Sequence, residues 1–232
     1  MNSKKSLYHG YRFPAEIIGH AVWLYYRFCL SFRDVEDLLA ERGIEVSYES
    51  IRAWCNRFGP EYARSLKNRP GCRGETWFLD EVFVKIGGEL QYLWRAVDQD
   101  GDCLDILVQK RRNKKAAKRF FRKLLKGQGA APRLMITDKL RSYSAAHREM
   151  MPSVMHSTEQ YDNNRAELSH QPTRQRERQM RRFKSAGQAQ RFLSIQGEVC
   201  NLFRLGRHLT RAVHYRAFRS RAFTEWRQIA CA

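Results

Sequence analysis

The chain has no apolar segment approaching the roughly 18 residues that would cross a bilayer. Its opening residues, MNSKKSLYHG, lack the apolar core of a signal peptide. The six cysteines form no C-x-x-C pair and have no pair of histidines nearby, so neither a zinc finger nor a disulfide framework is indicated. We therefore expect a soluble, cytoplasmic protein without membrane contact, whose cysteines are reduced packing residues.

Acidic residues are scarce relative to basic ones. There are 24 Asp and Glu against 43 Lys and Arg, which gives a formal net charge of +19. So large an excess repels itself unless a polyanion is present, which makes nucleic acid the leading partner. An anionic membrane surface is the competing partner, but no spanning segment accompanies the charge. The length of 232 residues allows two domains.

The first part of the chain has helical periodicity. Gly43 is placed as the C-cap of one helix, and Ser47 as the N-cap of a following helix that buries Ile51, Trp54 and Phe58. This spacing is typical of a helix-turn-helix, although a plain helical bundle has the same pattern. The basic excess favours DNA binding, so we predict an all-α DNA-binding domain over residues 1–66.

In such a domain the start of the second helix faces the base edges. We expect Tyr48, Ser50 and Arg52 to contact bases there and Arg57 to contact phosphate. The composition changes at residues 67–74, which are rich in proline and glycine and predict a linker.

Beyond the linker the pattern becomes extended. Residues 76–86, 89–98 and 102–110 predict three strands joined by tight turns in an antiparallel meander. An amphipathic helix over 113–129 follows, ended by Gly127 and Gly129. The short apolar run up to Asp138 is then expected to lie parallel to the first strand, because it returns to the sheet through a helix.

Helix is expected again before Met150, a fifth strand at 153–160, and Arg-rich helix from Asn163 onward. We predict an α/β fold with a mixed sheet over residues 75–185. A basic helical extension over residues 186–232 would pack on that domain or on a second protomer.

Three acids are candidates for catalysis. Asp80 lies within the first strand and Asp138 ends the strand expected beside it, so their carboxylates should meet at one edge. Two such charges repel unless a divalent metal lies between them, and hard oxygen ligands select Mg²⁺ or Mn²⁺. Among the acids that follow, Glu167 is best placed, with Arg174 two helical turns later.

Structural roles compete with these assignments. Asp80 could pair with Lys85 or Arg95, and Asp138 could cap the next helix. Glu81 points away from Asp80 on the strand and is not expected to be a ligand. His156 and His170 are more often phosphate or packing contacts, and the acids between Asp98 and Asp105 fit a hairpin turn better than a calcium loop.

A dense basic series follows Glu167 and includes a single acid, which favours phosphate contact over a solvated face. The cations expected to contact DNA here and beside Asp138 are Arg174, Arg178, Arg181, Arg182 and Lys139.

Five segments together resemble the DDE transposases of bacterial insertion sequences, specifically the insertion sequence six family: WFLDEVFVKI, YLWRAVDQDG, RRNKKAAKRFF, ITDKLRSY and NNRAELSHQPTRQRERQMRRFKS. The resemblance covers nearly the whole chain. It implies a ribonuclease-H-like catalytic fold with two Mg²⁺ ions, for which Mn²⁺ substitutes, and a triad of Asp80, Asp138 and Glu167 followed by the basic residue Arg174.

The resemblance also implies a reaction. Water cuts at the transposon end to free a 3′-hydroxyl, which attacks target DNA without a covalent enzyme intermediate. Because two double-stranded DNA ends must be held together, we expect at least a homodimer in the bacterial cytoplasm.

Two other functions are compatible with parts of this pattern. A DNA-binding regulator with an inactive ribonuclease-H-like domain would be favoured by loss of a triad acid, but all three are present. A ribonuclease-H-type nuclease without strand transfer would have no need of a helix-turn-helix.

Overall fold

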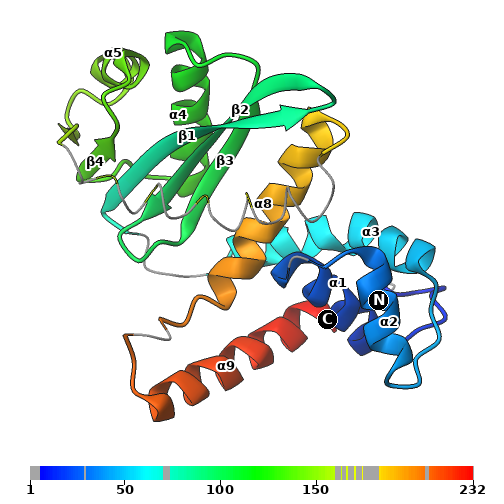
Figure 1. Ribbon diagram of the computed structural model, residues 1–232. Coiled ribbons are helices and arrows are strands. Elements are labelled where there is room, and N and C mark those ends of the chain that lie inside the picture. Colours follow the sequence, from blue (N-terminus) through cyan, green and yellow to red (C-terminus); the bar gives the residue numbers. More distant parts are fainter. Residues whose placement is uncertain are drawn as a thin grey trace, which may run out of the picture. The chain divides into compact units, whose positions relative to one another are not determined.

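The computed structural model describes residues 6–28, 30–69, 74–159, 163, 166, 170, 174, 183–206 and 209–231. These residues fold into two compact units (Figure 1). One unit combines Met1–Arg69 with Glu198–Ala232, and the other is Pro70–Gly197. The domain boundaries at residues 66, 74 and 185 stay predictions. No helix in the described ranges has both the length and the apolar character needed to span a membrane.

Helices make up the first unit. Its elements are α1 (Ala15–Arg27), α2 (Phe32–Ala40), α3 (Tyr48–Lys67) and α9 (Ala212–Ala230). Ser31 and Asp34 form a reciprocal capping box at the start of α2. Ser47 caps α3 as predicted, because its hydroxyl accepts a hydrogen bond from the Ser50 backbone N–H. The predicted succession of helix, turn and helix is therefore present.

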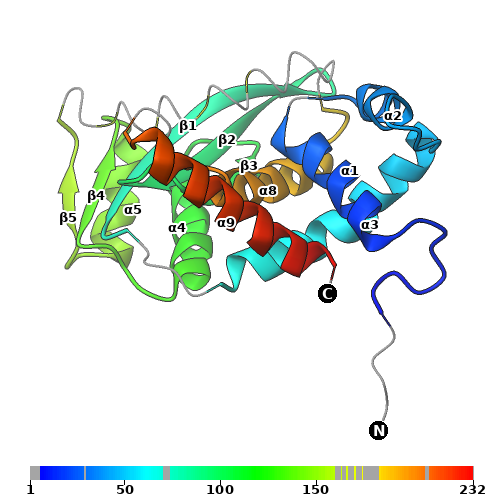
Figure 2. The same cartoon turned by 90° about the horizontal axis from the view of Figure 1, so that it is seen from below.

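The buried stripe of the C-terminal helix α9 packs against α1 and α3 (Figure 2). Trp226 is buried, with its ring 5.4 Å from that of Tyr62 on α3, and Ala230 lies against Gly19 of α1. The expectation that this extension packs on the catalytic domain is wrong for α9, whereas its packing on a second protomer stays a prediction. The amphipathic pattern had shown that α9 needs a partner, but could not show which one.

The turn between α2 and α3 depends on one glycine. Gly43 has a φ angle of +72°, and a Cβ added there would meet nothing within 4 Å. We therefore expect Gly43→Ala to lower the free energy of unfolding by about 1 kcal/mol through backbone strain alone. Gly187→Ala is the control, since it lies in a right-handed helix with open space around it and should stabilise by about 0.5 kcal/mol. Urea denaturation measures both, and equal losses would contradict this account.

A five-stranded sheet forms the centre of the second unit. Its strands are β1 (Thr76–Ile86), β2 (Glu89–Asp98), β3 (Cys103–Gln109), β4 (Leu134–Thr137) and β5 (Met155–Ser157). They are ordered β3-β2-β1-β4-β5. The first three strands are antiparallel neighbours, whereas β4 runs parallel to β1 and β5 parallel to β4. This confirms the predicted meander and parallel return, and it is the ribonuclease-H-like mixed sheet that the resemblance implied.

One face of the sheet is covered by α4 (Lys114–Gln128) and α5 (Arg141–Met150) (Figure 1). The core there is aromatic, with Trp94 of β2 packed against Phe120 and Tyr143. The helix α4 runs through Gly127 and ends at Gly129, whose φ angle is +73°, so the prediction that Gly127 also ends it is wrong. A glycine in the last turn is tolerated where the other residues of the helix pack well.

The outer edge of β3 is hydrogen-bonded by a side chain of α8 (Ala186–Leu202). Gln190 accepts from the Val108 backbone N–H at 2.8 Å and donates to the Ile106 carbonyl at 3.1 Å. These bonds satisfy backbone groups that an edge strand otherwise leaves unpaired. Described residues between α8 and α9 are not helical, so the expectation of continuous helix from Asn163 onward is wrong there, and Gly206 with a φ angle of +57° lies in the break.

Candidate active site

The pairing of β1 with β4 brings two of the predicted acids together. Leu79 lies opposite Thr137 in the last register pair of these parallel strands. Asp80 and Asp138 follow those two residues directly. Parallel neighbours present successive residues side by side, so Asp80 and Asp138 lie next to each other at this edge of the sheet, as the sequence predicted.

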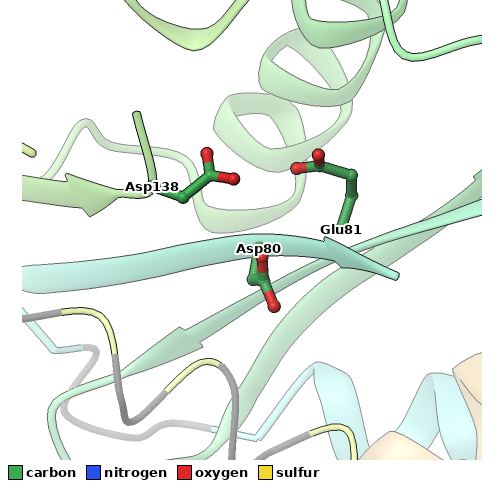
Figure 3. A group of neighbouring side chains, drawn as sticks. All are labelled: Asp80, Glu81 and Asp138. Carbon is green, nitrogen blue, oxygen red and sulfur yellow. The ribbon is translucent and has the colours of Figure 1, made fainter. Parts of the chain in front are cut away.

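A third carboxylate joins them. One oxygen each from Asp80, Glu81 and Asp138 lies within 4.8 Å of the others. Figure 3 shows the side chains of Glu81 and Asp138 on one side of β1 and that of Asp80 on the other. The side chain of Glu81 does point away from that of Asp80, as expected, but the side chain of Asp138 lies on the same side of β1 as Glu81. Glu81 therefore belongs by position to the cluster, although strand alternation had predicted that it is not a ligand.

The position of Glu81 is electrostatically unfavourable. Its side chain is 2% exposed, and burial, followed by the negative charge of Asp138, raises its pKa to about 7. Arg112, with a guanidinium nitrogen 3.5 Å from a Glu81 carboxylate oxygen, opposes this shift. Burial and the adjacent Glu81 in turn raise the pKa of Tyr143 well above its usual range. Burial and the charge of Asp138 therefore both disfavour the ionised form of Glu81.

Asp138 also takes part in a turn. Its Oδ1 atom accepts a hydrogen bond at 3.0 Å from the backbone N–H of Leu140, the residue before α5. The alternative that Asp138 caps the next helix is wrong, because α5 has no side-chain cap hydrogen bond and its N-cap residue is Leu140. The carboxylate instead bonds the turn just before the helix. The bond fixes one oxygen of a group that also faces Glu81, so the structural and catalytic roles are compatible.

On its own side of β1, Asp80 lies beside a buried histidine. The Nε2 atom of His170 is 3.3 Å from Asp80 Oδ2, within ion-pair distance but outside hydrogen-bond geometry. Burial lowers the pKa of His170 while Asp80 opposes that shift. Arg95 occupies the position directly opposite Asp80 on β2. His170, expected to be a phosphate or packing contact, is buried and lies against one of the predicted catalytic acids.

The third predicted acid, Glu167, lies outside the described residues. Two described residues on either side of it in the sequence contact β1: Asn163 contacts Leu79, and His170 contacts Asp80. The Asn163 side-chain amide donates to the Leu79 carbonyl at 2.8 Å.

The three described carboxylates fit a divalent cation. Oxygen ligands about 2.1 Å from a Mg²⁺ ion lie roughly 3 Å apart when adjacent and roughly 4.2 Å apart when opposite. The separation of up to 4.8 Å between the three oxygens is a little longer than the larger of these two distances, so the three residues are close enough to share one ion after a small approach. The raised pKa of Glu81 marks a place where added positive charge would be stabilising.

The four residues of α3 predicted to contact DNA differ in exposure and in side-chain partners. Arg52 is exposed, and Arg57 forms an exposed ion pair with Glu61 at 3.7 Å. The ring of Tyr48 lies under the Arg33 guanidinium at 4.2 Å, and the Ser50 hydroxyl is 3.2 Å from that of Ser47. Arg52 and Arg57 are thus the two exposed cations among the four.

The other predicted DNA contacts lie in the second unit. Lys139 and Arg174 are exposed, and the Arg174 backbone N–H donates to the His170 carbonyl at 3.0 Å. Arg178, Arg181 and Arg182 lie outside the described residues.

Comparison with known sequences identifies the family. Residues 74–206 match the family described as a DDE domain, which is more than half of the chain. The chain is 32% identical over 164 residues to the transposase for insertion sequence-like element IS431mec of Staphylococcus aureus, covering 68% of this chain and 73% of that protein. The same figures apply to the Staphylococcus aureus transposase for insertion sequence element IS257 in transposon Tn4003.

Among solved structures, the HTLV-2 integrase catalytic core domain is similar at 18% sequence identity, with a TM-score of 0.33 over 41% of this chain and 67% of that one. The family match covers both strands that carry the acid cluster, and the transposase relatives extend over two-thirds of the chain. The chain belongs to the DDE transposases of bacterial insertion sequences, in the insertion sequence six family.

Proposed function

We propose that Asp80, Asp138 and Glu167 hold two Mg²⁺ ions and that the chain uses them to cut transposon ends and join them to target DNA. The observation that carries this proposal is the convergence of Asp80 and Asp138 from adjacent parallel strands of a DDE transposase. The contacts of Asn163 and His170 with β1 support Glu167, which lies between them in the sequence, as the third acid.

Each residue of the site has a separate task. When bound, the two ions activate the attacking water or 3′-hydroxyl and stabilise the leaving oxygen. The carboxylates of Asp80 and Asp138 supply hard oxygen ligands from neighbouring positions, because these residues directly follow Leu79 and Thr137, which are register partners in the sheet. His170 limits the rotation of the Asp80 carboxylate through its close contact. Glu81 adds negative charge beside Asp138 and so strengthens the attraction for a cation.

DNA recognition is divided between the two units. The start of α3, with Tyr48, Ser50, Arg52 and Arg57, reads the transposon end, and the exposed Arg52 makes the first contact. Lys139, Arg174, Arg178, Arg181 and Arg182 contact the phosphates of the strand that reacts. Two ends are held by at least two copies of the chain, and DNA as substrate places the reaction in the bacterial cytoplasm.

Metal dependence tests this function directly. Adding Mg²⁺ or Mn²⁺ is expected to raise the melting temperature of the wild-type chain, because a ligand that binds only the folded state stabilises it. Joining of a labelled transposon-end duplex to plasmid DNA should require the same ions and stop when they are chelated. The thermal shift should be lost in Asp80→Asn, whose side chain keeps its size but not its charge.

A matched control is Glu75→Gln, which removes an acid that is 77% exposed and immediately precedes β1. It should keep both the thermal shift and the joining activity. An unchanged metal response in Asp80→Asn would show that the acid cluster is not the metal site.

A further inference from the structure

The end of β4 is held by a side-chain contact that no catalytic role requires. Thr137, the last residue of β4, is fully buried. Its Oγ1 atom lies 2.8 Å from the Asp138 carbonyl oxygen and 2.9 Å from Nε2 of His156 on β5. His156 pairs with Met135, two residues before Thr137, so both side chains are on the same face of the sheet.

The protons in this chain of contacts can be assigned. A carbonyl oxygen only accepts hydrogen bonds, and a threonine hydroxyl carries one proton. Thr137 therefore donates its proton to the Asp138 carbonyl and accepts from His156. His156 must then carry its proton on Nε2. The two bonds run in one direction, from the edge strand to the backbone of Asp138.

A second histidine supports this arrangement. His147 of α5 lies with Nε2 2.8 Å from the Val154 carbonyl oxygen, which fixes the segment just before β5. Its ring centroid is 4.8 Å from that of His156. Burial, followed by the nearby His147, lowers the pKa of His156 to about 4, so the ring is neutral near pH 7.

The hydrogen bonds of Thr137 lie where the pairing of β4 with its neighbouring strands ends. The register of β4 with β1 extends to Thr137, and its register with β5 extends to Ile136. The Thr137 hydroxyl adds a hydrogen bond one residue beyond the strand pairing, to the carbonyl oxygen of Asp138. On the far side of that residue, the Leu140 backbone N–H bonds the Asp138 carboxylate. The backbone and the side chain of Asp138 are thus each fixed by a hydrogen bond.

We propose that Thr137 and His156 are positioning residues that orient Asp138 for metal binding. The proposal rests on the proposed function, because it takes Asp138 as a metal ligand. Neither residue touches metal or DNA in this role. Residues that orient a ligand usually change metal affinity or activity by about 10–100-fold when they are removed.

Paired variants of the full chain separate the hydrogen bond from packing. Thr137→Val keeps the volume but loses the hydroxyl, whereas Thr137→Ser keeps the hydroxyl. His156→Ala loses the donor, whereas His156→Gln retains an amide N–H on a side chain of similar reach. Met155→Ala is the matched control on β5, since its side chain is exposed.

Two measurements are made on each variant: the Mg²⁺ concentration giving half of the thermal shift, and the rate of strand joining at low and at saturating Mg²⁺. We expect Thr137→Val and His156→Ala to need about 10-fold more Mg²⁺ and to recover part of their rate when it saturates. Thr137→Ser, His156→Gln and Met155→Ala should stay near wild type.

Several outcomes would overturn the proposal. A folded Thr137→Val with a wild-type Mg²⁺ requirement would do so, and so would equal losses in the valine and serine variants, since packing alone would then explain them. If the Thr137 variants do not fold, the half-buried His156 gives the same comparison. A wild-type metal response in Asp138→Asn would contradict the proposed function instead, which separates the two failures.

Discussion

Asp138→Asn is expected to lower strand joining by at least about 1,000-fold while leaving binding to a transposon-end duplex unchanged. The substitution removes one negative charge from the acid cluster and weakens a metal ligand. Asparagine has the same shape, and its side-chain oxygen still accepts the bond from the Leu140 backbone N–H. The fold should therefore persist, and only the chemistry should be lost.

The same variant has an expected effect on stability. The charge of Asp138 raises the pKa of Glu81, so without metal the two carboxylates disfavour each other. Removing that charge should leave the melting temperature of the metal-free chain unchanged or higher. Added Mg²⁺ should stabilise the wild type more than the variant. The wild type should therefore have the higher melting temperature when Mg²⁺ is present.

Binding and joining of one labelled duplex by wild type and Asp138→Asn, with Glu75→Gln as control, provide the measurement. Equal joining by all three would refute the role of Asp138. Binding without joining by all three would favour the alternative of a DNA-binding regulator with an inactive catalytic domain.

Trp94→Ala is expected to lower the free energy of unfolding by about 3–5 kcal/mol. Trp94 is fully buried, with its ring 6.0 Å from that of Phe120 and 5.2 Å from that of Tyr143. It also lies directly opposite Glu81 in the pairing of β1 with β2. A cavity here would remove core packing and loosen the strand that carries Asp80 and Glu81, so joining activity should fall together with stability.

Trp94→Phe separates aromatic packing from hydrogen bonding. The indole N–H of Trp94 has no hydrogen-bond partner among the described residues. Replacement by phenylalanine therefore removes part of the buried aromatic surface but no hydrogen bond. Its loss in urea denaturation should be clearly smaller than that of alanine. A loss below about 1 kcal/mol for Trp94→Ala would contradict the packing described for this face.

Local pattern was sufficient for much of the fold. The extents of β1, β2 and β3 follow from extended apolar runs between glycine-containing turns, and the start of α3 follows from Ser47. These features depend on residues close together in the sequence, where backbone preference and capping act directly. The partner of α9 did not follow, because an apolar stripe specifies that burial is needed but not where.

Motif, periodicity and strand order in the sequence are sufficient to predict the family, the mixed sheet and the placement of Asp80 beside Asp138. Only the tertiary structure decided that Glu81 joins the acids and that His170 contacts Asp80. Alternation along a strand fixes which side Glu81 faces. The side taken by Asp138, one residue beyond its strand, is set by the bonds made with Leu140 and Thr137, and such contacts exist only once the chain has folded.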